Sequence, residues 1–263
     1  MITPRVIPCL LLCGFGLVKT VKFKDPEYIG DTRNAVKIFN EKEVDELVIL
    51  DIKATTDERP PQFDLVREIV SEAFMPVAYG GGIRSVEDGR TLLQLGVEKL
   101  VMSTAAVEDA SLVRNAAREF GSQSVVVCMD IKKSFRGRHE LYTHGGRKKS
   151  KLDPVTFAKR VEEMGAGEII VNSIDRDGTM AGYDLELIRS VALAVRIPVI
   201  ALGGAGKLED FRCAVTEGGA SAVAAGSIFI FHGKHKAVLI SYPSLDDIGA
   251  TFLHSKARAG KEL

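Results

Sequence analysis

The sequence predicts a (β/α)8 barrel, an α/β fold in which eight parallel strands alternate with helices. Three observations predict it: a length of 263 residues, eight short apolar runs separated by helical-period segments, and an internal repeat. Eight such units in about 250 residues are typical of this barrel, and a doubly wound parallel sheet is the alternative. We expect one domain over residues 1–263, with half-barrels at about 1–120 and 121–263.

The predicted strands are apolar runs that end in small or polar residues. Near-continuous apolarity suits parallel strands that are covered on both faces. In chain order the runs are Arg5–Leu12, Glu46–Ile52, Pro76–Gly80, Lys99–Ser103, Ser124–Ile131, Glu168–Ser173, Pro198–Gly203 and Ser221–Gly226. Amphipathic stretches between the runs predict helices, for example at Asp31–Glu43, Ser85–Leu95, Pro154–Met164 and Asp184–Val195.

The internal repeat relates the two halves of the chain. The segment PVAYGGGIRSVEDG from Pro76 resembles PVIALGGAGKLEDF from Pro198, at an offset of 122 residues. The same offset takes Glu46 to Glu168 and aligns ELVILD with EIIVNS. Because the match continues over several elements, we interpret it as a two-fold repeat of half-barrels.

Composition and charge limit the possible partners. The chain has 35 basic and 35 acidic residues and no formal net charge, which argues against a dedicated binder of nucleic acid or membrane surfaces. No apolar run reaches the roughly 18 residues of a membrane span, and the N-terminal segment lacks a signal-peptide cleavage site. Cys9, Cys13, Cys128 and Cys213 lack CxxC spacing. We expect a cytoplasmic protein with core thiols, no metal and no cofactor.

Glycine-rich loops follow the third and seventh predicted strands, at residues 80–82 and 203–206. Both precede helices, so backbone N–H groups and a helix N-terminus could face one anion. Ser103-Thr104 and Gly226-Ser227 end the fourth and eighth strands beside these loops. The pattern predicts one phosphate-binding cup in each half, and tight turns that need glycine are the alternative explanation.

Two carboxylates end apolar strands at the expected functional face. Asp51 ends VILD and Asp130 ends VVVCMD, so each is a candidate for proton transfer or for a structural contact with a loop amide. The repeat pairs Cys128 with Cys9 and therefore Asp130 with Leu11. A mechanism with two carboxylates on the first and fifth strands is incomplete in this chain.

The opposite face presents charged residues at four strand starts. Arg5, Glu46, Lys99 and Glu168 precede the apolar part of the first, second, fourth and sixth strands. Two cations and two anions could pair into a ring that closes the barrel bottom. The alternative is ordinary solvated strand starts, whose exposed pairs contribute only about 0–1 kcal/mol each.

Together these segments resemble the cyclase subunit of imidazole glycerol phosphate synthase, the HisF family, to about Phe231. The motifs that carry the resemblance are RVIPCL, DELVILDI, YGGGIRSVED, FGSQSVVV, YTHGGRK, GAGEI, DRDGT, GYDLELIR and PVIALGGAGKLEDF. In that family a glutaminase subunit docks on the barrel bottom, and ammonia crosses the barrel to the top. There the ammonia attacks a bisphosphorylated aminoimidazole precursor, with strand-one and strand-five aspartates as acid and base.

The resemblance implies a role for each candidate residue. It makes Arg5, Glu46, Lys99 and Glu168 the charged gate for ammonia, and Asp130 the strand-five catalytic aspartate. It implies phosphate contacts at Gly82, Ser103, Thr104, Gly178, Gly204, Gly226 and Ser227. It adds Lys19, Asp51, Asn172 and Asp177 to the substrate site. It implies a heterodimer with a HisH-like glutaminase and a phosphorylated small molecule or anion at the barrel top.

Departures from the family pattern concentrate at the top of the barrel. Leu11 stands where the family has the strand-one catalytic aspartate, and residues 12–16 lack its polar lysine–aspartate loop. Leu202 replaces a serine and Asn172 replaces a threonine. The stretch GSIFIFHGKHKAVLISYPS, with IPCLLL and LVKTVKF, resembles the glycosyl amidation-associated (WbuZ-type) paralogues. Those are thought to work with a HisH-like glutaminase and an N-acetyl sugar amidotransferase.

Three functions follow from these observations. The first is a subunit that takes ammonia from a glutaminase and passes it on for amidation of a surface-polysaccharide sugar. The second is an authentic cyclase of histidine synthesis, which Leu11 impairs because it cannot move a proton. The third, a sugar-phosphate isomerase on the same half-barrel plan, also needs paired carboxylates and does not explain four charged strand starts.

Overall fold

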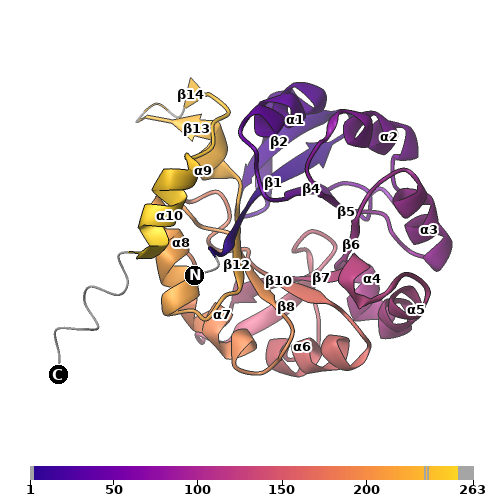
Figure 1. Cartoon of the computed structure of the whole chain (residues 1–263). Helices are drawn as coiled ribbons and strands as arrows, with labels where there is room; N and C mark the ends of the chain where they lie inside the picture. Colours follow the sequence, from indigo (N-terminus) through magenta and orange to yellow (C-terminus); the bar gives the residue numbers. More distant parts are fainter. Residues whose placement is uncertain (1–2, 234, 236, 254–263) are drawn as a thin grey trace.

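Parallel strands close into a barrel in the computed structural model, which describes residues 3–233, 235 and 237–253 (Figure 1). In spatial order the barrel strands are β1 (Arg5–Cys13), β4 (Leu47–Asp51), β5 (Val77–Gly80), β6 (Lys99–Met102), β7 (Val125–Lys133), β10 (Glu168–Ser173), β11 (Val199–Leu202) and β12 (Ala222–Ala225). Because β12 pairs back to β1, the doubly wound sheet is excluded and the (β/α)8 prediction is confirmed. Residues 1–2, 234, 236 and 254–263 of the predicted halves lie outside the described part.

Helices surround the barrel as an outer layer (Figure 1). They are α1 (Thr32–Glu41), α2 (Phe63–Glu72), α3 (Val86–Gln94), α5 (Ala110–Phe120), α6 (Pro154–Glu163), α7 (Leu185–Ala192), α8 (Leu208–Thr216) and α10 (Leu245–Leu253). Their starts follow from capping chemistry. Ser85 and Asp88 form a capping box on α3, and Asp153 caps α6 ahead of a proline at its first position. None of the described helices is long and apolar enough to cross a bilayer.

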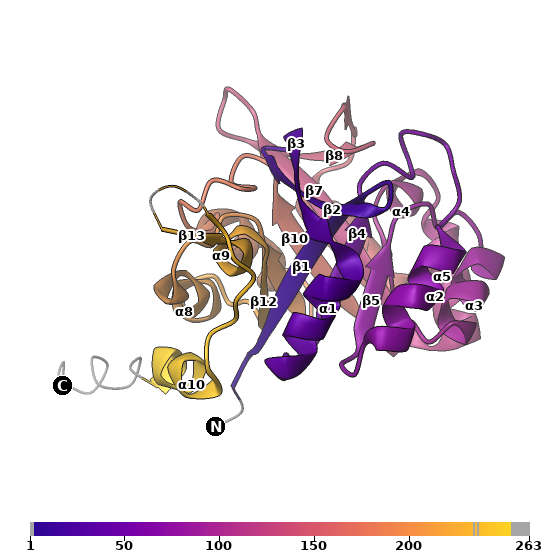
Figure 2. The same ribbon diagram turned by 90° about the horizontal axis from the view of Figure 1, so that it is seen from above.

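Each half-barrel carries the same two additions at the strand ends. An antiparallel extension follows the first strand of each half: β2 (Gly16–Val21) with β3 (Lys24–Asp31), and β8 (His139–Thr143) with β9 (Lys148–Lys149). A one-turn helix follows the last strand of each half: α4 (Thr104–Glu108) and α9 (Ser227–Ile230). Figure 2 shows β3 and β8 rising above one end of the barrel.

Two apolar clusters lie on the two faces of the barrel strands. The outer cluster packs strands against helices and includes Phe39, Tyr79 and Phe157. The inner cluster fills the barrel, and its members alternate along each strand with outer ones, as the period of two requires. The inner residues are Ile7, Cys9, Val48, Ala78, Val101, Val126, Cys128, Ile170, Ile200, Leu202, Ala222 and Ala224, with Leu11 and Leu50 packed against them.

The chain after the last barrel strand returns to the strand-start end. It forms the short pair β13 (Phe231–His232) and β14 (Ala237–Val238), and then α10 packs beside α8. The Tyr242 hydroxyl donates a 2.7 Å hydrogen bond to the carbonyl of Val6, which ties this segment to the first strand. Figure 2 shows α10 lying at the same end as the N-terminus, away from β3 and β8.

Candidate functional site

A cavity of about 1320 Å³ opens at the carboxyl ends of the barrel strands. We call it the mouth. Every residue predicted for catalysis, phosphate binding or the substrate site lines it. These residues are Lys19, Asp51, Gly82, Ser103, Thr104, Asp130, Asn172, Asp177, Gly178, Gly204, Gly226 and Ser227. Substrate sites of (β/α)8 enzymes lie at this end because the loops after the strands converge there.

The two glycine loops are sterically constrained turns. Gly82 has φ +78°, and a Cβ there would come within 2.8 Å of the backbone of Pro61. Gly204 has φ +118°, and a Cβ there would come within 2.2 Å of the carbonyl oxygen of Gly182. Turn geometry alone therefore requires glycine at both positions. Anion binding by these loops is an additional role that the turns permit.

The two hydroxyl groups beside the first glycine loop are engaged within the protein. Ser103 Oγ donates to Asp130 Oδ2 at 3.1 Å, and Thr104 Oγ1 accepts the backbone N–H of His144 at 2.9 Å. His144, a lone loop histidine in the sequence, thus lies at the rim of the mouth. Residue types alone carried no signal for this contact, since it runs through the backbone.

Asp130 is the acidic group at the centre of one side of the mouth. Its carboxylate accepts hydrogen bonds from Ser103 Oγ and, at 2.9 Å, from Asn172 Nδ2. Burial raises the pKa of Asp130 to about 6, while the hydrogen bonds from Asn172 and Ser103 oppose the rise. A carboxyl group with this pKa can exchange protons near neutral pH.

Lys19 and Asp177 anchor the β2–β3 hairpin, Lys19 to β1 and Asp177 to the loop after β10. Lys19 Nζ donates to the carbonyl of Cys9 at 3.1 Å, and burial lowers the pKa of this lysine. Asp177 accepts hydrogen bonds from Thr20 Oγ1 at 2.7 Å and from the Phe23 backbone at 3.2 Å. Both charged side chains therefore fix the position of the hairpin over the mouth. The contribution of Thr20 was not predicted, because a lone threonine in a strand has no distinctive signature.

Asp51 makes the contacts of a structural carboxylate. It accepts the backbone N–H groups of Lys53 and Ala54, both at 3.1 Å. The Arg59 guanidinium and the Gln62 amide also donate to it, at 2.7 Å and 3.0 Å. These donors pin the loop after β4. The geometry favours the second of the two sequence interpretations, a structural contact with loop amides.

Leu11 occupies the mouth on the side away from Asp130. It is aligned with Leu50 on the neighbouring strand, and both pack on the inner cluster. Neither side chain can donate or accept a proton. The inner edge of the mouth therefore presents the Asp130 carboxylate on β7 and the apolar side chains of Leu11 and Leu50 on β1 and β4.

At the opposite end, Arg5, Glu46, Lys99 and Glu168 form a closed ring of ion pairs, which we call the charged ring. Arg5 pairs with both glutamates, and Lys99 Nζ lies 2.8 Å from Glu46 and 2.9 Å from Glu168. The expectation of solvated strand starts is wrong for this ring. The Glu46 side chain is only 4% exposed and that of Lys99 17%, because barrel closure packs the four strand starts together.

The space between the charged ring and the mouth is filled by the inner cluster. Its members are aliphatic except for Cys9 and Cys128, two free cysteines. Burial raises the pKa of Cys9 to about 12 and also raises that of Cys128, so both thiols are neutral. The barrel interior is therefore uncharged and packed with small and branched side chains.

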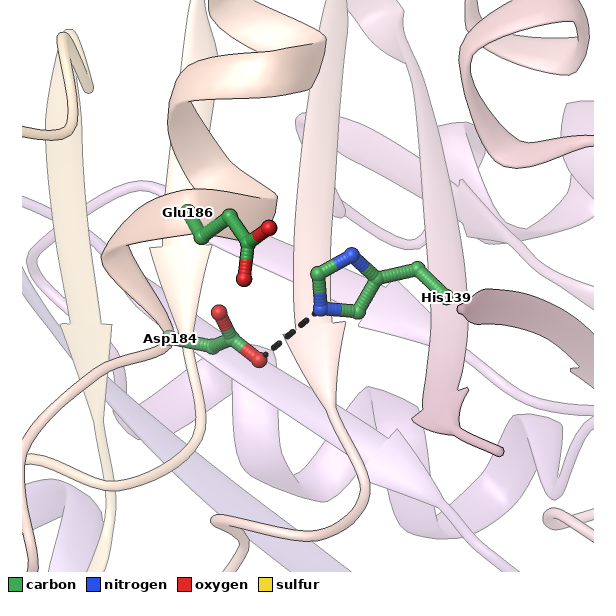
Figure 3. A group of neighbouring side chains, drawn as sticks. All are labelled: His139, Asp184 and Glu186. Atoms are coloured by element: carbon green, nitrogen blue, oxygen red, sulfur yellow. Dashed lines mark hydrogen bonds and ion pairs between the residues drawn. The ribbon is translucent and has the colours of Figure 1, made fainter. Parts of the chain in front are cut away.

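One further group of titratable side chains lies outside the mouth. His139, Asp184 and Glu186 bring one ligand atom each within 4.8 Å of one another (Figure 3). His139 Nε2 lies 3.1 Å from Asp184 Oδ2, and Lys133 Nζ lies 2.9 Å from Glu186. Asp184 also caps α7. These pairs account for all three groups as an anchor of β7 and β8 to the start of α7.

Comparisons with known proteins agree with this architecture. A profile of the family described as histidine biosynthesis protein matches residues 5–236. A Pseudomonas aeruginosa protein, provisionally named imidazole glycerol phosphate synthase subunit hisF2, is 51% identical over 95% of this chain and 100% of its own length. A Leptospira interrogans protein, provisionally named as the HisF subunit, is 46% identical over 96% and 100%. The HisF subunit of Alkaliphilus metalliredigens is 45% identical over 88% and 92%. The chain therefore belongs to the histidine biosynthesis protein family, in its HisF branch.

Proposed function

We propose that this chain is a HisF-like synthase subunit that receives ammonia from a HisH-like glutaminase and passes it through the barrel. The nitrogen is then used to amidate a surface-polysaccharide sugar of the lipopolysaccharide or O-antigen type. One observation carries the proposal: a complete charged ring stands at one end of an uncharged interior, while Leu11 removes an acid–base group at the other end.

The charged ring is suited to gating. Replacing a buried ion network by apolar residues is often neutral or stabilising, so stability alone is a weak reason for its presence. Lys99 pairs with both glutamates, and Arg5 pairs with the same two. If Lys99 swings outward, Glu46 and Glu168 each keep a partner. Opening the ring therefore leaves no carboxylate unpaired.

The interior is suited to ammonia and unsuited to ammonium. Moving an unpaired ion into an apolar interior costs far more than moving a neutral polar molecule. The inner cluster offers no ionised side chain between the charged ring and the mouth, and its two thiols are neutral. We infer that nitrogen crosses as NH3. The four free cysteines also lead us to propose a reducing, cytoplasmic setting.

The partners of this chain follow from the same proposal. A HisH-like glutaminase forms a heterodimer with the strand-start face, a reading that the HisF subunit names of the relatives support. An N-acetyl sugar amidotransferase then uses the nitrogen, since Leu11 stands where ring closure requires the strand-one carboxylate. Resemblance of the stretch Gly226–Ser244 to amidation-associated paralogues supports this second partner.

A phosphorylated small molecule or anion is the proposed ligand of the mouth. Backbone N–H groups of the glycine loops and the starts of α4 and α9 supply positive dipoles to such a ligand. The proposed contacts are Gly82, Ser103 and Thr104 in one half, and Gly178, Gly204, Gly226 and Ser227 in the other.

The second candidate is the cyclase of imidazole glycerol phosphate synthase. It is favoured by the 45% identity to a HisF subunit and by Asp130, whose pKa of about 6 suits proton transfer. Loss of one acid–base group typically lowers the rate by about 10²–10⁴-fold, so this reading predicts at most slow turnover.

An ammonia-dependent cyclase assay on the purified chain separates the two functions, because free ammonium bypasses the glutaminase. Our proposal expects little or no turnover of the aminoimidazole bisphosphate. A rate comparable to that of a cyclase with both aspartates would refute it. The positive test adds the glutaminase and the sugar amidotransferase and measures glutamine-dependent amidation of the sugar, which must depend on this chain.

A further inference from the structure

Two β-hairpins, β1–β2 and β7–β8, extend barrel strands at the mouth end, and each carries an exposed phenylalanine in its turn. Phe15 lies between β1 and β2 and is 80% exposed, and Phe135 lies between β7 and β8 and is 94% exposed. In the barrel order, β4, β5 and β6 separate β1 from β7 on one side, and β10, β11 and β12 separate them on the other. The two turns therefore lie on opposite sides of the mouth.

The turn that carries Phe135 is held in place by its own contacts. The backbone N–H of Ser134 donates to the carbonyl of Arg138 at 2.8 Å, which closes the turn. The Arg136 guanidinium lies 5.2 Å from the centroid of the Phe135 ring, at the distance of a cation–π contact. The anchor of β7 and β8 to α7 holds the base of the same hairpin (Figure 3). The exposed ring is therefore preorganised, which lowers the entropic cost of binding a partner.

Positive charge is concentrated in residues 132–151, which include this hairpin and which we call the basic segment. The segment contains eight basic residues and one acidic residue, whereas the rest of the chain contains 27 basic and 34 acidic ones. Three of the eight cations pair with Glu186, Glu108 and Glu140. The other five are exposed and form no ion pair with a described residue: Lys132, Arg136, Arg138, Arg147 and Lys151. Because Lys132 and Arg147 line the mouth, this unpaired charge reaches its edge.

The opposite hairpin carries no excess of charge, since residues 14–31 contain three basic and three acidic residues. An anionic membrane presents its charge evenly across the mouth and attracts basic residues on both sides. A protein can instead present a local acidic patch to one hairpin and an apolar pocket to each phenylalanine. Aromatic residues and arginine are also enriched in the cores of protein interfaces. The uneven charge and the two exposed rings together favour a protein partner.

We propose that the Phe15 turn, the Phe135 turn and the basic segment form a docking surface for the protein that consumes the ammonia. That protein presents an acidic patch to the basic segment and apolar pockets to the two rings. This inference rests on the proposed function, in which the consumer is an N-acetyl sugar amidotransferase. A protein that contacts both turns spans the mouth, so nitrogen passes to it without entering bulk solvent. The proposed glutaminase face is the opposite end of the barrel, so both partners can bind at once.

Calorimetric titration of the purified amidotransferase into the full chain tests this surface. Phe135→Ser and Phe15→Ser should each raise Kd by about tenfold or more, as truncation of an aromatic anchor does. Added salt should weaken the wild-type complex, and Arg138→Glu should weaken binding at low salt and reduce this salt dependence. Phe74→Ser is the matched control. Phe74 is 90% exposed in the turn before β5, at the strand-start end, so its replacement should leave this Kd unchanged.

Two results would overturn the inference: no binding of the amidotransferase to the wild-type chain, or the same Kd for the wild type and Phe135→Ser. Vesicles of phosphatidylglycerol give a further comparison, because binding to them that is lost in Phe135→Ser, without binding of the amidotransferase, would assign the surface to a membrane and contradict the proposal. Glutamine-dependent amidation by the three-protein system is measured separately. Amidation without a complex leaves the proposed function intact and refutes the docking surface. A complex that depends on Phe135 without coupled amidation refutes the function and supports the surface.

Discussion

Replacement of Lys99 by methionine tests whether the charged ring is a buried network. Methionine keeps most of the side-chain volume and removes two ion pairs, with Nζ–O distances of 2.8 Å and 2.9 Å. Removing one partner of a fully buried pair costs about 3–5 kcal/mol, and an exposed pair is worth about 0–1 kcal/mol. Lys99 is 17% exposed, and both glutamates keep Arg5. We therefore expect Lys99→Met to lower the free energy of unfolding by about 1–3 kcal/mol.

Urea unfolding followed by circular dichroism measures this loss, and thermal unfolding should shift by about 2–4 °C per kcal/mol for a chain of this size. Lys37→Met is the matched control. Lys37 lies 3.4 Å from Glu72 with 56% of its side chain exposed, so its loss should cost no more than about 1 kcal/mol. Equal losses in the two variants would refute the argument from burial. A gating role further requires that Lys99→Met lowers glutamine-driven product more than ammonium-driven product.

Two other predictions concern the mouth. Because burial raises the pKa of Asp130 from 3.8 to about 6, the folded state binds the extra proton, and stability falls as pH rises through this window. Asp130→Asn should thus raise the free energy of unfolding at pH 7–8 by about 1–3 kcal/mol relative to the wild type. Unfolding measured as a function of pH should show this difference disappearing near pH 4. Crystals soaked in phosphate should show anion density at the Gly82 and Gly204 loops, and two empty loops would contradict the proposed phosphate contacts.

The barrel was predictable because the apolar runs, the internal repeat and the helix caps all indicate the same alternation of strands and helices. Eight apolar runs each overlap one barrel strand, and the repeat starting at Pro76 and Pro198 marks equivalent strands in the two halves. Helix starts were predictable from their caps: the predicted stretches beginning at Asp31, Ser85 and Asp184 include residues that cap α1, α3 and α7. The hairpin β2–β3 was not predicted, since its polar, exposed second strand lacks an alternating pattern.

The residues that line the mouth were predictable from the sequence, but the contacts between their side chains were not. The resemblance selected the residues that line the cavity, whereas their pairing depends on strands that are distant in sequence. Asn172 and Asp130 are 42 positions apart, and their alignment on adjacent strands brings them within 2.9 Å. The burial of Glu46 likewise depends on closure of the barrel between β12 and β1. Charge at a strand start carries no local signal of burial.

The half-barrel repeat shows that the aspartate missing at position 11 is one of several polar residues replaced in the first half of the mouth. Ser103, Asp130 and Asn172 correspond to Gly226, Leu11 and Leu50 in the other half, so the donors that would support a second carboxylate are also missing. Leu11→Asp alone would place a carboxylate against the inner cluster without the serine and amide donors that Asp130 has, which raises its pKa and destabilises the fold. We expect this variant to unfold more easily and to gain little cyclase activity. Leu11→Asp with Leu50→Asn restores the carboxylate–amide pair and should recover stability relative to the single variant. Equal stability of the two variants would contradict the need for a supporting amide.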